Sequence, residues 1–372
     1  MQNDTLHIVC LDVPYPPNYG GAIDMYYRIK AFHDLGWKII LHTFEYGRGK
    51  HQQLNEICEK VFYYTRKTGL SGHLSKRPYI VESRINSELS DRLKQDQHTI
   101  WLEGIHCCGL LEEHAFQERT VFVRTHNIEQ DYYQALAKQS SGWKRIFFTL
   151  EAKRLVNYEP ILKHATRLFA IQAEDVNHFQ KINANTTLLP PAFPSIEMED
   201  YDLKDYHLFH GNLSVPENES AAIWLTQEVM AKLPSEQFII AGKEPSDKLK
   251  RLLEQYSNIQ LIANPTEREM NRLIGEAKNH LLYTDQATGV KLKLINVLQS
   301  SGHVIVNPKM IEGTPFGAFC RIANTATDFI QFIQNNNEPM SCSTRDRWKF
   351  MQDMRPEMML TEKVIPYLSH YL

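Results

Sequence analysis

Two lysines follow a glycine in a segment whose chemistry suits a diphosphate. Thr288 and Gly289 open the run Thr-Gly-Val-Lys-Leu-Lys, which continues through Lys291 and Lys293 into an apolar helical stretch at 294–300. A glycine-bearing loop presents free backbone N–H groups, a helix N-terminus attracts anions, and two ammonium groups add full positive charge. This combination predicts a diphosphate site. The alternative interpretation is an exposed amphipathic helix whose lysines are solvated.

Two polar side chains near this segment could complete such a site. Asn296 lies inside the expected helix, and its amide can hydrogen-bond a ribose without adding charge. Glu312 follows the apolar run 303–306 and offers a carboxylate to ribose or sugar hydroxyls. Taken alone, Glu312 would be part of an ordinary turn.

The histidine with the best position for catalysis is His126. It follows the apolar run 120–123, at the end of an expected strand, where it can hydrogen-bond a reacting group or shuttle a proton near neutral pH. The chain has 16 histidines, and most histidines are structural. Position, rather than residue type, therefore selects this one.

Glycines follow three further expected strands. Gly20 and Gly21 come after the run 6–13 and open a helical stretch, so that a phosphate or a hydroxyl could reach helix amides; a tight turn is the alternative. Their spacing lacks the G-x-G-x-x-G pattern of dinucleotide sites, which weakens an oxidoreductase hypothesis. The corresponding positions in the second half are held by Gly211, Asn212, Gly242 and Lys243.

The composition excludes several classes of protein. With 41 Lys and Arg against 44 Asp and Glu, the formal net charge is -3, so no excess of base draws the chain to nucleic acid. No apolar run approaches the roughly 20 residues of a bilayer-spanning helix, and the polar residues 1–5 lack the basic region of a secretory signal. We therefore expect a cytoplasmic protein.

The six cysteines occur at spacings that fit neither a zinc ribbon nor a small disulfide scaffold, so we interpret them as reduced thiols. His106, Cys107 and Cys108 are adjacent, which could suggest a metal or redox site. Three consecutive residues rarely converge on one ion, however, and ordinary packing is the better explanation.

Short apolar runs separated by helical stretches predict parallel strands joined by helices. In the first half the expected strands lie at 6–13, 37–43, 61–64, 99–102, 120–123, 167–171 and 187–189. In the second half they lie at 207–210, 237–241, 259–261, 280–283 and 303–306. Two helices joined by a Ser-Ser-Gly turn are expected at 128–138 and 143–164.

Prolines at 190, 191 and 194 interrupt this rhythm and predict a domain boundary. The length of 372 residues also suits two domains of roughly 150 to 200 residues each. The expected parts are a Rossmann-like domain at 1–193, a second Rossmann-like domain at 194–345, and a helical segment at 346–372 that returns to the first domain. Pro356 and Pro366 should interrupt this last segment.

Seven short segments, taken in order, resemble the GT-B glycosyltransferases, especially the retaining group called family 4. They are 16–21, 125–129, 150–159, 211–224, 289–294, 301–306 and 312–313. The first resembles the first loop of the family, the second its central histidine segment, and the third the helix before its domain crossover. The fourth is similar to the start of its donor domain, and the last three are similar to its nucleotide-binding core. Together they span most of the chain.

The resemblance implies an α/β fold of two Rossmann-like domains facing a cleft, with an acceptor held by the first domain and a UDP- or GDP-sugar by the second. It implies transfer of a hexosyl group, mannosyl among the candidates, to a glycan or lipid-linked acceptor in surface polysaccharide synthesis, with retained anomeric configuration. No metal or cofactor would be needed. A lipid-linked acceptor would bring transient contact with the inner membrane face, although no strongly basic amphipathic helix marks a surface for it.

The resemblance also assigns roles to the candidate residues. Lys291 and Lys293 would neutralise the diphosphate, and Asn296 would bind the ribose. Glu312 would take the donor sugar or the ribose, and His126 would contact the donor sugar and the acceptor. The glycine pair of the first loop would bring a substrate close to backbone amides.

The chain departs from the family at three positions. The family commonly has two glutamates eight positions apart where Thr288 and Asn296 stand, and a serine is frequent in place of Gln172. Two other hypotheses therefore stay open. One is a nucleotide-sugar epimerase on the same architecture, and the other is a degenerate member that binds a nucleotide-sugar or a partner transferase without catalysis.

Overall fold

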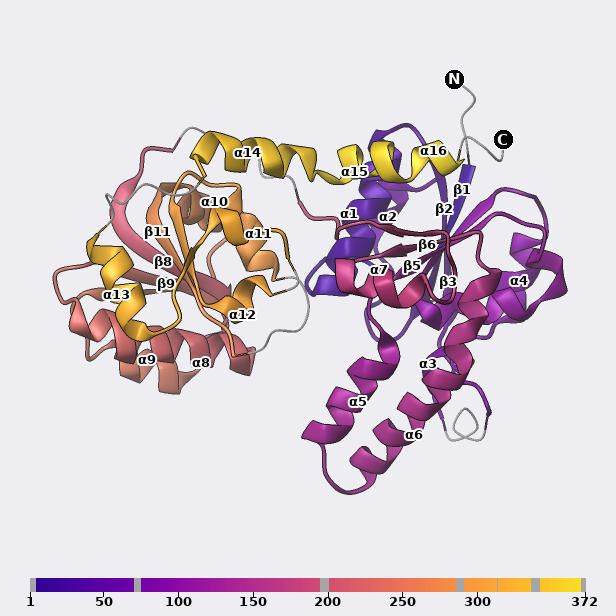
Figure 1. Cartoon of the computed structure of the whole chain (residues 1–372), viewed down its shortest axis with the longest axis horizontal. Helices are drawn as coiled ribbons and strands as arrows, with labels where there is room; N and C mark the ends of the chain where they lie inside the picture. The colour runs from indigo at the N-terminus through magenta and orange to yellow at the C-terminus, as the bar shows by residue number, and fades with distance from the viewer. Residues whose placement is uncertain are drawn as a thin grey trace. The chain divides into compact units, whose positions relative to one another are not determined.

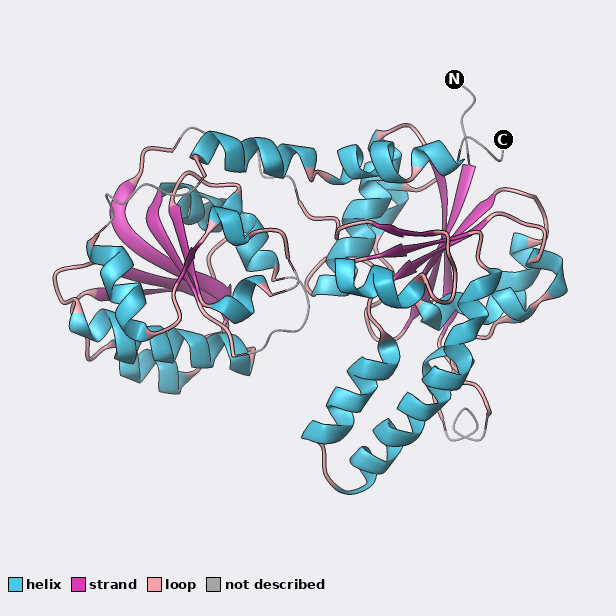
Figure 2. Ribbon diagram, viewed as in Figure 1, coloured by secondary structure: helices cyan, strands magenta, loops and turns pink. Residues whose placement is uncertain are grey.

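The computed structural model describes residues 5–69, 75–194, 201–285, 291–312, 314–335 and 342–368. The chain divides into two compact units, one formed by Met1–Phe193 with Met354–Leu372 and the other by Pro194–Asp353. Each unit has one parallel sheet with helices packed on it (Figures 1 and 2). The fold class expected from the sequence, two Rossmann-like domains, is confirmed.

The first unit contains a seven-stranded parallel sheet in the order β3-β2-β1-β4-β5-β6-β7. The strands are β1 (Thr5–Cys10), β2 (Lys38–Glu45), β3 (Lys60–Thr65), β4 (Thr99–Glu103), β5 (Val121–Thr125), β6 (Arg167–Ala170) and β7 (Thr186–Leu188). The apolar runs of the sequence predict all seven. The strand order reverses between β1 and β4, and ligands of doubly wound sheets bind at such a point, beyond the carboxyl ends of the strands.

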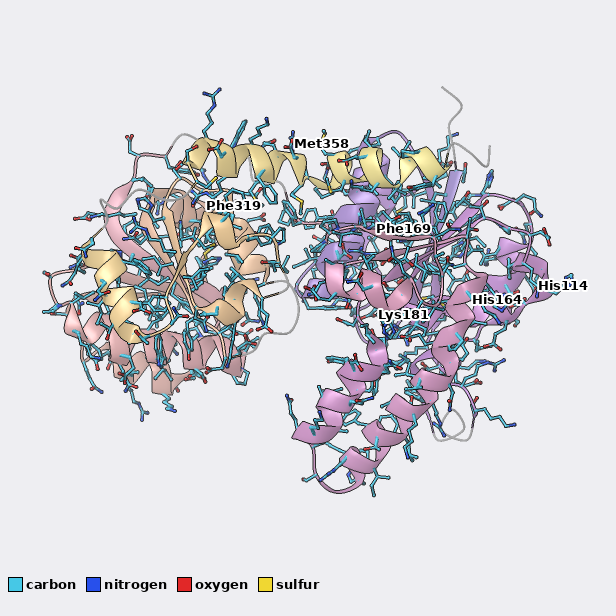
Figure 3. All side chains as sticks on the ribbon, in the orientation of Figure 1. His114, His164, Phe169, Lys181, Phe319 and Met358 are labelled. Carbon is cyan, nitrogen blue, oxygen red and sulfur yellow. The ribbon has the colours of Figure 1, made fainter. Side chains whose placement is uncertain are left out.

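Helices cover both faces of this sheet. They are α1 (Gly20–Asp34), α2 (Gln52–Ile57), α3 (Tyr79–Glu82), α4 (Ser87–Leu93), α5 (Glu129–Gln139), α6 (Gly142–Tyr158) and α7 (Ala173–Phe179), with 3-10 turns at Ile105–Glu112, His114–Phe116 and Glu159–His164. Successive residues of β1 enter different cores, because Ile8 joins the cluster of α1 and Phe169 whereas Val9 joins the cluster of Leu102. Phe169 is labelled among the side chains of Figure 3.

The second unit contains a six-stranded parallel sheet in the order β10-β9-β8-β11-β12-β13. Its strands are β8 (Lys204–Asn212), β9 (Phe238–Lys243), β10 (Ile259–Ala263), β11 (Ala277–Leu282), β12 (His303–Val306) and β13 (Arg321–Ile322). No apolar run predicts β13, because a strand of two residues has no periodicity to detect. The other five strands are predicted by the apolar runs.

The helices of the second unit include α8 (Pro216–Trp224), α9 (Asp247–Leu253), α10 (Glu267–Glu276), α11 (Leu292–Leu298), α12 (Pro308–Ile311), α13 (Ala326–Gln334) and α14 (Thr344–Asp353). Short π and 3-10 turns at Leu225–Val229 and Met230–Lys232 extend α8, and another 3-10 turn lies at Gly317–Phe319. In the described part of the chain, no helix combines the length and the apolar composition needed to cross a bilayer.

The C-terminal helices belong to different units. The helix α14 contacts α11 and lies in the second unit, whereas α15 (Pro356–Lys363) and α16 (Ile365–Leu368) lie in the first, where α15 packs on α1. Leu360, Val364 and Leu368 are buried in the same core as α1. The part of the C-terminal segment that belongs to the first unit begins at Met354, because α14 belongs to the second unit.

Candidate functional site

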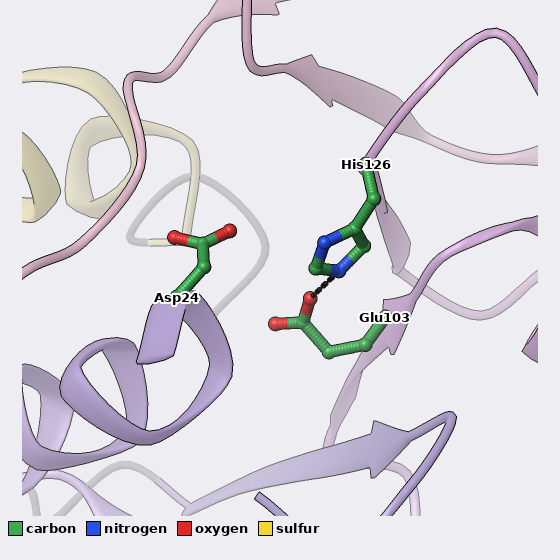
Figure 4. Close-up of side chains that lie close together, drawn as sticks. All are labelled: Asp24, Glu103 and His126. Carbon is green, nitrogen blue, oxygen red and sulfur yellow. Dashed lines mark hydrogen bonds and ion pairs between the residues drawn. The ribbon is translucent and has the colours of Figure 1, made fainter. Parts of the chain in front are cut away.

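His126 lies beside a buried carboxylate at the carboxyl edge of the first sheet. Glu103 is the last residue of β4, and its Oε2 is 2.7 Å from Nε2 of His126, which follows β5 (Figure 4). The other carboxylate oxygen, Oε1, accepts the indole N–H of Trp101 at 2.7 Å. Both oxygens of Glu103 are thus fixed. With Nε2–H donating to the carboxylate, the neutral ring keeps Nδ1 as an acceptor.

Asp24 of α1 joins this pair. One ligand atom each of Asp24, Glu103 and His126 lie within 4.8 Å of one another, and Figure 4 shows the three side chains converging. Asp24 comes from the helix that begins at the first glycine loop, so three elements meet here: the start of α1, the end of β4 and the end of β5.

A pair of arginines holds Asp24 ionised. Arg28 donates to Oδ1 of Asp24 at 2.6 Å and Arg124 donates to Oδ2 at 3.0 Å. Burial would raise the pKa of the Asp24 carboxyl, but the guanidinium groups of Arg124 and Arg28 outweigh burial and hold its pKa below the usual range. The ion pairs are fully buried, so removing one partner would leave an uncompensated charge.

The same network binds the chain just before the domain boundary. Arg28 donates to the carbonyl of Pro190 at 3.1 Å, Arg124 donates to the carbonyl of Leu189, and Asp24 accepts the N–H of Ala192 at 2.6 Å. The segment 189–192 therefore has three hydrogen bonds to groups that surround His126.

The three clustered side chains do not have the surroundings of a cation site. Asp24 already accepts from two guanidinium groups and a backbone amide, and Glu103 accepts from an indole and pairs with His126. Two buried positive charges next to the cluster would repel a divalent ion. The arrangement suits a neutral hydrogen-bond donor, such as a hydroxyl group, facing Nδ1 of His126.

Gly20 and Gly21 are the first residues of α1, next to the carboxyl end of β1. Tyr19 precedes them without capping the helix by a side-chain hydrogen bond, and Arg48 braces the loop through a 3.0 Å bond to Asn18. A Cβ built on Gly20 would meet nothing within 4 Å, and one on Gly21 would meet only the Tyr19 ring at 3.1 Å. Because both residues are helical, no turn requires glycine at position 20.

In the second unit, the two lysines bind residues at the start of α8. Lys293 donates to Oδ1 of Asn218 at 2.9 Å, and Lys291 lies 3.3 Å from Oε1 of Glu217, which also accepts from Thr284. Burial lowers the pKa of Lys293 to about 8, while Glu217 raises it and Lys291 lowers it further. The structure thus places both lysines beside the first turn of α8.

The glycines at 211 and 242 have a steric role. They are paired residues on β8 and β9, and a Cβ on Gly242 would lie 2.0 Å from the carbonyl oxygen of Gly211. A Cβ on Gly211 would lie 3.2 Å from Asn218, whose amide donates to the carbonyl of Asn212. Gly211 therefore makes room for the side chain that binds Lys293. Lys243, at the end of β9, is exposed.

The remaining candidates are less well defined. Asn296 lies on α11, and its buried Oδ1 has no hydrogen-bond partner among the described residues. Glu312 ends α12 and is exposed. Thr288 and Gly289 lie outside the described residues, as does Gly313.

Sequence reasoning missed several residues of both sites. Glu103 carries a usable signal, because it is an acidic residue at the carboxyl end of an apolar strand. Asp24 carries none, since its partner Arg124 is 100 positions away and only the fold brings the two together. The missed residues are Asp24, Arg28, Glu103, Glu217 and Thr284.

No protein-family model matches the chain. A Klebsiella pneumoniae protein, named as an uncharacterized 44.6 kDa protein in the cps region, is 26% identical over 359 residues, covering 90% of this chain and 91% of its own.

Solved glycosyltransferases resemble the whole structure. The chain matches the lipopolysaccharide outer core galactosyltransferase WaaB in its apo form, at a TM-score of 0.63 and 10% identity over 99% of both chains. It matches Anabaena HepE in complex with UDP and glucose at 0.61 and 10% identity, over 99% of this chain and 100% of HepE. It matches the pneumococcal O-GlcNAc transferase GtfA in complex with UDP and GlcNAc at 0.62 and 10% identity over all of both chains. The chain therefore has the GT-B glycosyltransferase fold.

Proposed function

We propose that this chain is a glycosyltransferase that moves a hexosyl group from a nucleotide-sugar to a glycan or lipid-linked acceptor. The observation that carries the proposal is the His126–Glu103 pair, fixed by Trp101 at the carboxyl edge of a GT-B sheet. A histidine held in one tautomer presents a defined acceptor to a hydroxyl group. In the second unit, Lys291 and Lys293 lie beside the first turn of α8, and their positive charge supports placing the donor there.

The donor in this proposal is a UDP- or GDP-sugar bound by the second unit. Lys291 and Lys293 neutralise the leaving diphosphate, Asn296 accepts from the ribose, and Glu312 binds the ribose or the sugar. The UDP complexes of HepE and GtfA favour UDP over GDP. Basic side chains carry the diphosphate charge in this scheme, so we propose that transfer needs neither metal nor cofactor.

The acceptor in this proposal is an intermediate of surface polysaccharide synthesis in the cytoplasm. The relative encoded in a Klebsiella cps region and the lipopolysaccharide galactosyltransferase support this assignment. We propose retention of anomeric configuration, as in family 4, with mannose among the candidate sugars. A product of inverted configuration would instead give His126 the role of a base that deprotonates the acceptor.

Calorimetry with UDP-, GDP- and ADP-sugars, followed by a transfer assay with NMR of the anomeric proton, tests the proposal. We expect one nucleotide class to bind without added metal and EDTA to leave transfer unchanged. His126→Ala should spare donor binding and abolish transfer, whereas Lys293→Ala should weaken binding. If no nucleotide bound, the donor-site assignment would be wrong, and full transfer by His126→Ala would exclude its catalytic role.

A second candidate function is non-catalytic binding of a nucleotide-sugar, and the observation that favours it is the uncharged Asn296 on α11. Binding of a donor without transfer or hydrolysis would support this candidate. Interconversion of two nucleotide-sugars in the absence of an acceptor would instead identify an epimerase.

A further inference from the structure

The α5–α6 hairpin carries an apolar surface that the fold leaves uncovered. Trp143, Ile146 and Leu150 are 72%, 63% and 50% exposed and lie three and seven positions apart on one side of α6. Ala152 and Leu155, on the opposite side, are buried. The helix is therefore apolar on two faces, and only the inner face packs on the protein.

The hairpin extends away from the sheet of the first unit, with its turn at the far end (Figures 1 and 2). Trp143 lies in the first turn of α6, so a highly exposed aromatic ring is at this tip.

The residues around this apolar surface are basic. Between residues 132 and 158 the only acidic residue is Glu151, which is buried and bound by Arg154 at 2.7 Å and by the N–H of Tyr79 at 2.6 Å. The basic residues of the same segment are Lys138, Lys144, Arg145, Lys153 and Arg154. In a chain whose net charge is -3, this concentration is complementary to an anionic surface.

Two of these cations lie where the helix itself disfavours them. Lys144 and Arg145 follow Gly142, the first residue of α6, and the first turn holds no acidic residue. The positive end of the helix dipole repels cations, and no ion pair involves either side chain within the described part of the chain. Their placement gains nothing for the fold, but an anion at the tip would be bound by both the charges and the dipole.

We propose that the tip and outer face of α6 dock on a bilayer that contains anionic lipids. Trp143, Ile146 and Leu150 insert at the boundary between headgroups and acyl chains, where tryptophan is favoured. Lys144 and Arg145 meet the anionic headgroups. The inference goes beyond the sugar chemistry and does not depend on it, because the surface lies outside both candidate sites.

Sedimentation of the full chain with lipid vesicles tests this proposal. We expect binding to vesicles of phosphatidylglycerol and phosphatidylethanolamine, weakening as salt rises, and little binding to phosphatidylcholine alone. The double variants Trp143→Ser/Ile146→Ser and Lys144→Glu/Arg145→Glu should each lower the apparent affinity at least tenfold. Matched controls are Trp348→Ser on α14, where Trp348 is 50% exposed, and Lys250→Glu/Arg251→Glu on α9.

Calorimetric donor binding by each variant separates this proposal from the transferase proposal. A variant that binds the donor normally but no longer binds vesicles supports the docking surface. If Trp143→Ser/Ile146→Ser does not fold, the result for Lys144→Glu/Arg145→Glu decides. Wild-type binding to the anionic vesicles by Lys144→Glu/Arg145→Glu, or no vesicle binding by the wild type, would overturn the proposal. Self-association that Trp143→Ser abolishes, without vesicle binding, would show instead that the surface joins two copies.

Discussion

At the scale of single residues, the ammonium group of Lys293 should titrate close to neutral pH. Burial lowers its pKa to about 8, so the free protein loses this charge as pH rises through 8. Donor affinity should therefore fall about tenfold between pH 7 and pH 9. Lys293→Arg should remove this dependence, because a guanidinium stays protonated. Calorimetry across that range decides, and a flat wild-type profile would place the diphosphate away from Lys293.

Glu103 is expected to act through His126. Glu103→Gln keeps a hydrogen-bonding group beside Nε2, but the amide no longer holds His126 in the tautomer that leaves Nδ1 as an acceptor. Transfer should therefore fall about 10²-fold, while donor affinity is unchanged. The matched control is Glu113→Gln, since Glu113 forms a surface ion pair with Lys94. Transfer assays and calorimetry on both variants provide the measurement. A Glu103→Gln enzyme with wild-type transfer would reduce the carboxylate to a packing role.

The residue scale also shows what sequence can and cannot predict. An apolar run in the sequence shows where a strand ends, and polar residues at strand ends are candidates for a site. This criterion selects His126 after β5, and applied to the end of β4 it also selects Glu103. The partners of Asp24 lie on β5 and before the domain boundary, and no local pattern connects them. Spacing in sequence carries information only for residues that one element positions.

At the scale of elements, a substitution at the start of α1 can test whether the first glycine loop binds a substrate or is only a structural turn. Gly20→Ala should leave the free energy of unfolding within about 0.5 kcal/mol, because its Cβ meets nothing within 4 Å and alanine favours helix. The KM for donor or acceptor should rise, since the methyl group blocks the helix amides. Thermal unfolding and steady-state kinetics measure both effects.

Gly242→Ala is the contrasting variant. Its Cβ would lie 2.0 Å from the carbonyl oxygen of Gly211, so we expect a loss of about 1–3 kcal/mol in stability from the displaced strand. If Gly20→Ala kept wild-type kinetics, the glycine would be only a helix-start residue and the first loop would not contact substrate.

The helix α1 also holds the buried ion network. Asp24→Asn removes the carboxylate that pairs directly with the buried Arg28 and Arg124, so the first unit should lose about 3–5 kcal/mol of stability. Lys30→Ala removes a surface pair with Asp34 on the same helix and should cost less than about 1 kcal/mol. Urea unfolding of the two variants makes the comparison, and equal losses would mean that the network does not stabilise the unit.

The positions of the helices and strands are largely predictable from the sequence, whereas the face of a helix that becomes buried is not. The helix α6 follows from its sequence, but its apolar residues surround it, so the pattern shows no single amphipathic face. Only the structure shows that Ala152 and Leu155 are buried and Trp143 is exposed. The sequence analysis therefore found no amphipathic surface where the fold displays one.

At the scale of the whole molecule, the division into two units coincides with an interruption in the alternation of strands and helices along the chain. The prolines after β7 end the first sheet, and the units divide between Phe193 and Pro194. The chain rejoins the first unit at Met354, between α14 and α15. Pro356 marks the break between these two helices in the sequence, but no local pattern shows that α14 belongs to one unit and α15 to the other.

Each unit also has a buried histidine that should make it sensitive to acid. Burial lowers the pKa of His42 in the first unit and of His210 in the second to about 3. In the unfolded chain these rings bind protons below about pH 6.5, whereas in the folded protein they stay neutral until about pH 3. The stability that the neutral rings contribute is therefore complete above about pH 6.5 and is lost as the pH falls towards about 3. Lowering the pH from 7.5 to 5 should reduce the free energy of unfolding by about 2 kcal/mol for each of these histidines.

Scanning calorimetry at pH 7.5 and pH 5.0 can assign this loss to the two units. His210→Leu should recover about 2 kcal/mol at pH 5 in the transition of the second unit only, because the apolar ring replacement has no proton to take up in either state. His33→Leu, at an exposed position on α1, is the matched control and should change neither transition. If His210→Leu shifted both transitions equally, the two units would unfold together in one cooperative transition and not independently.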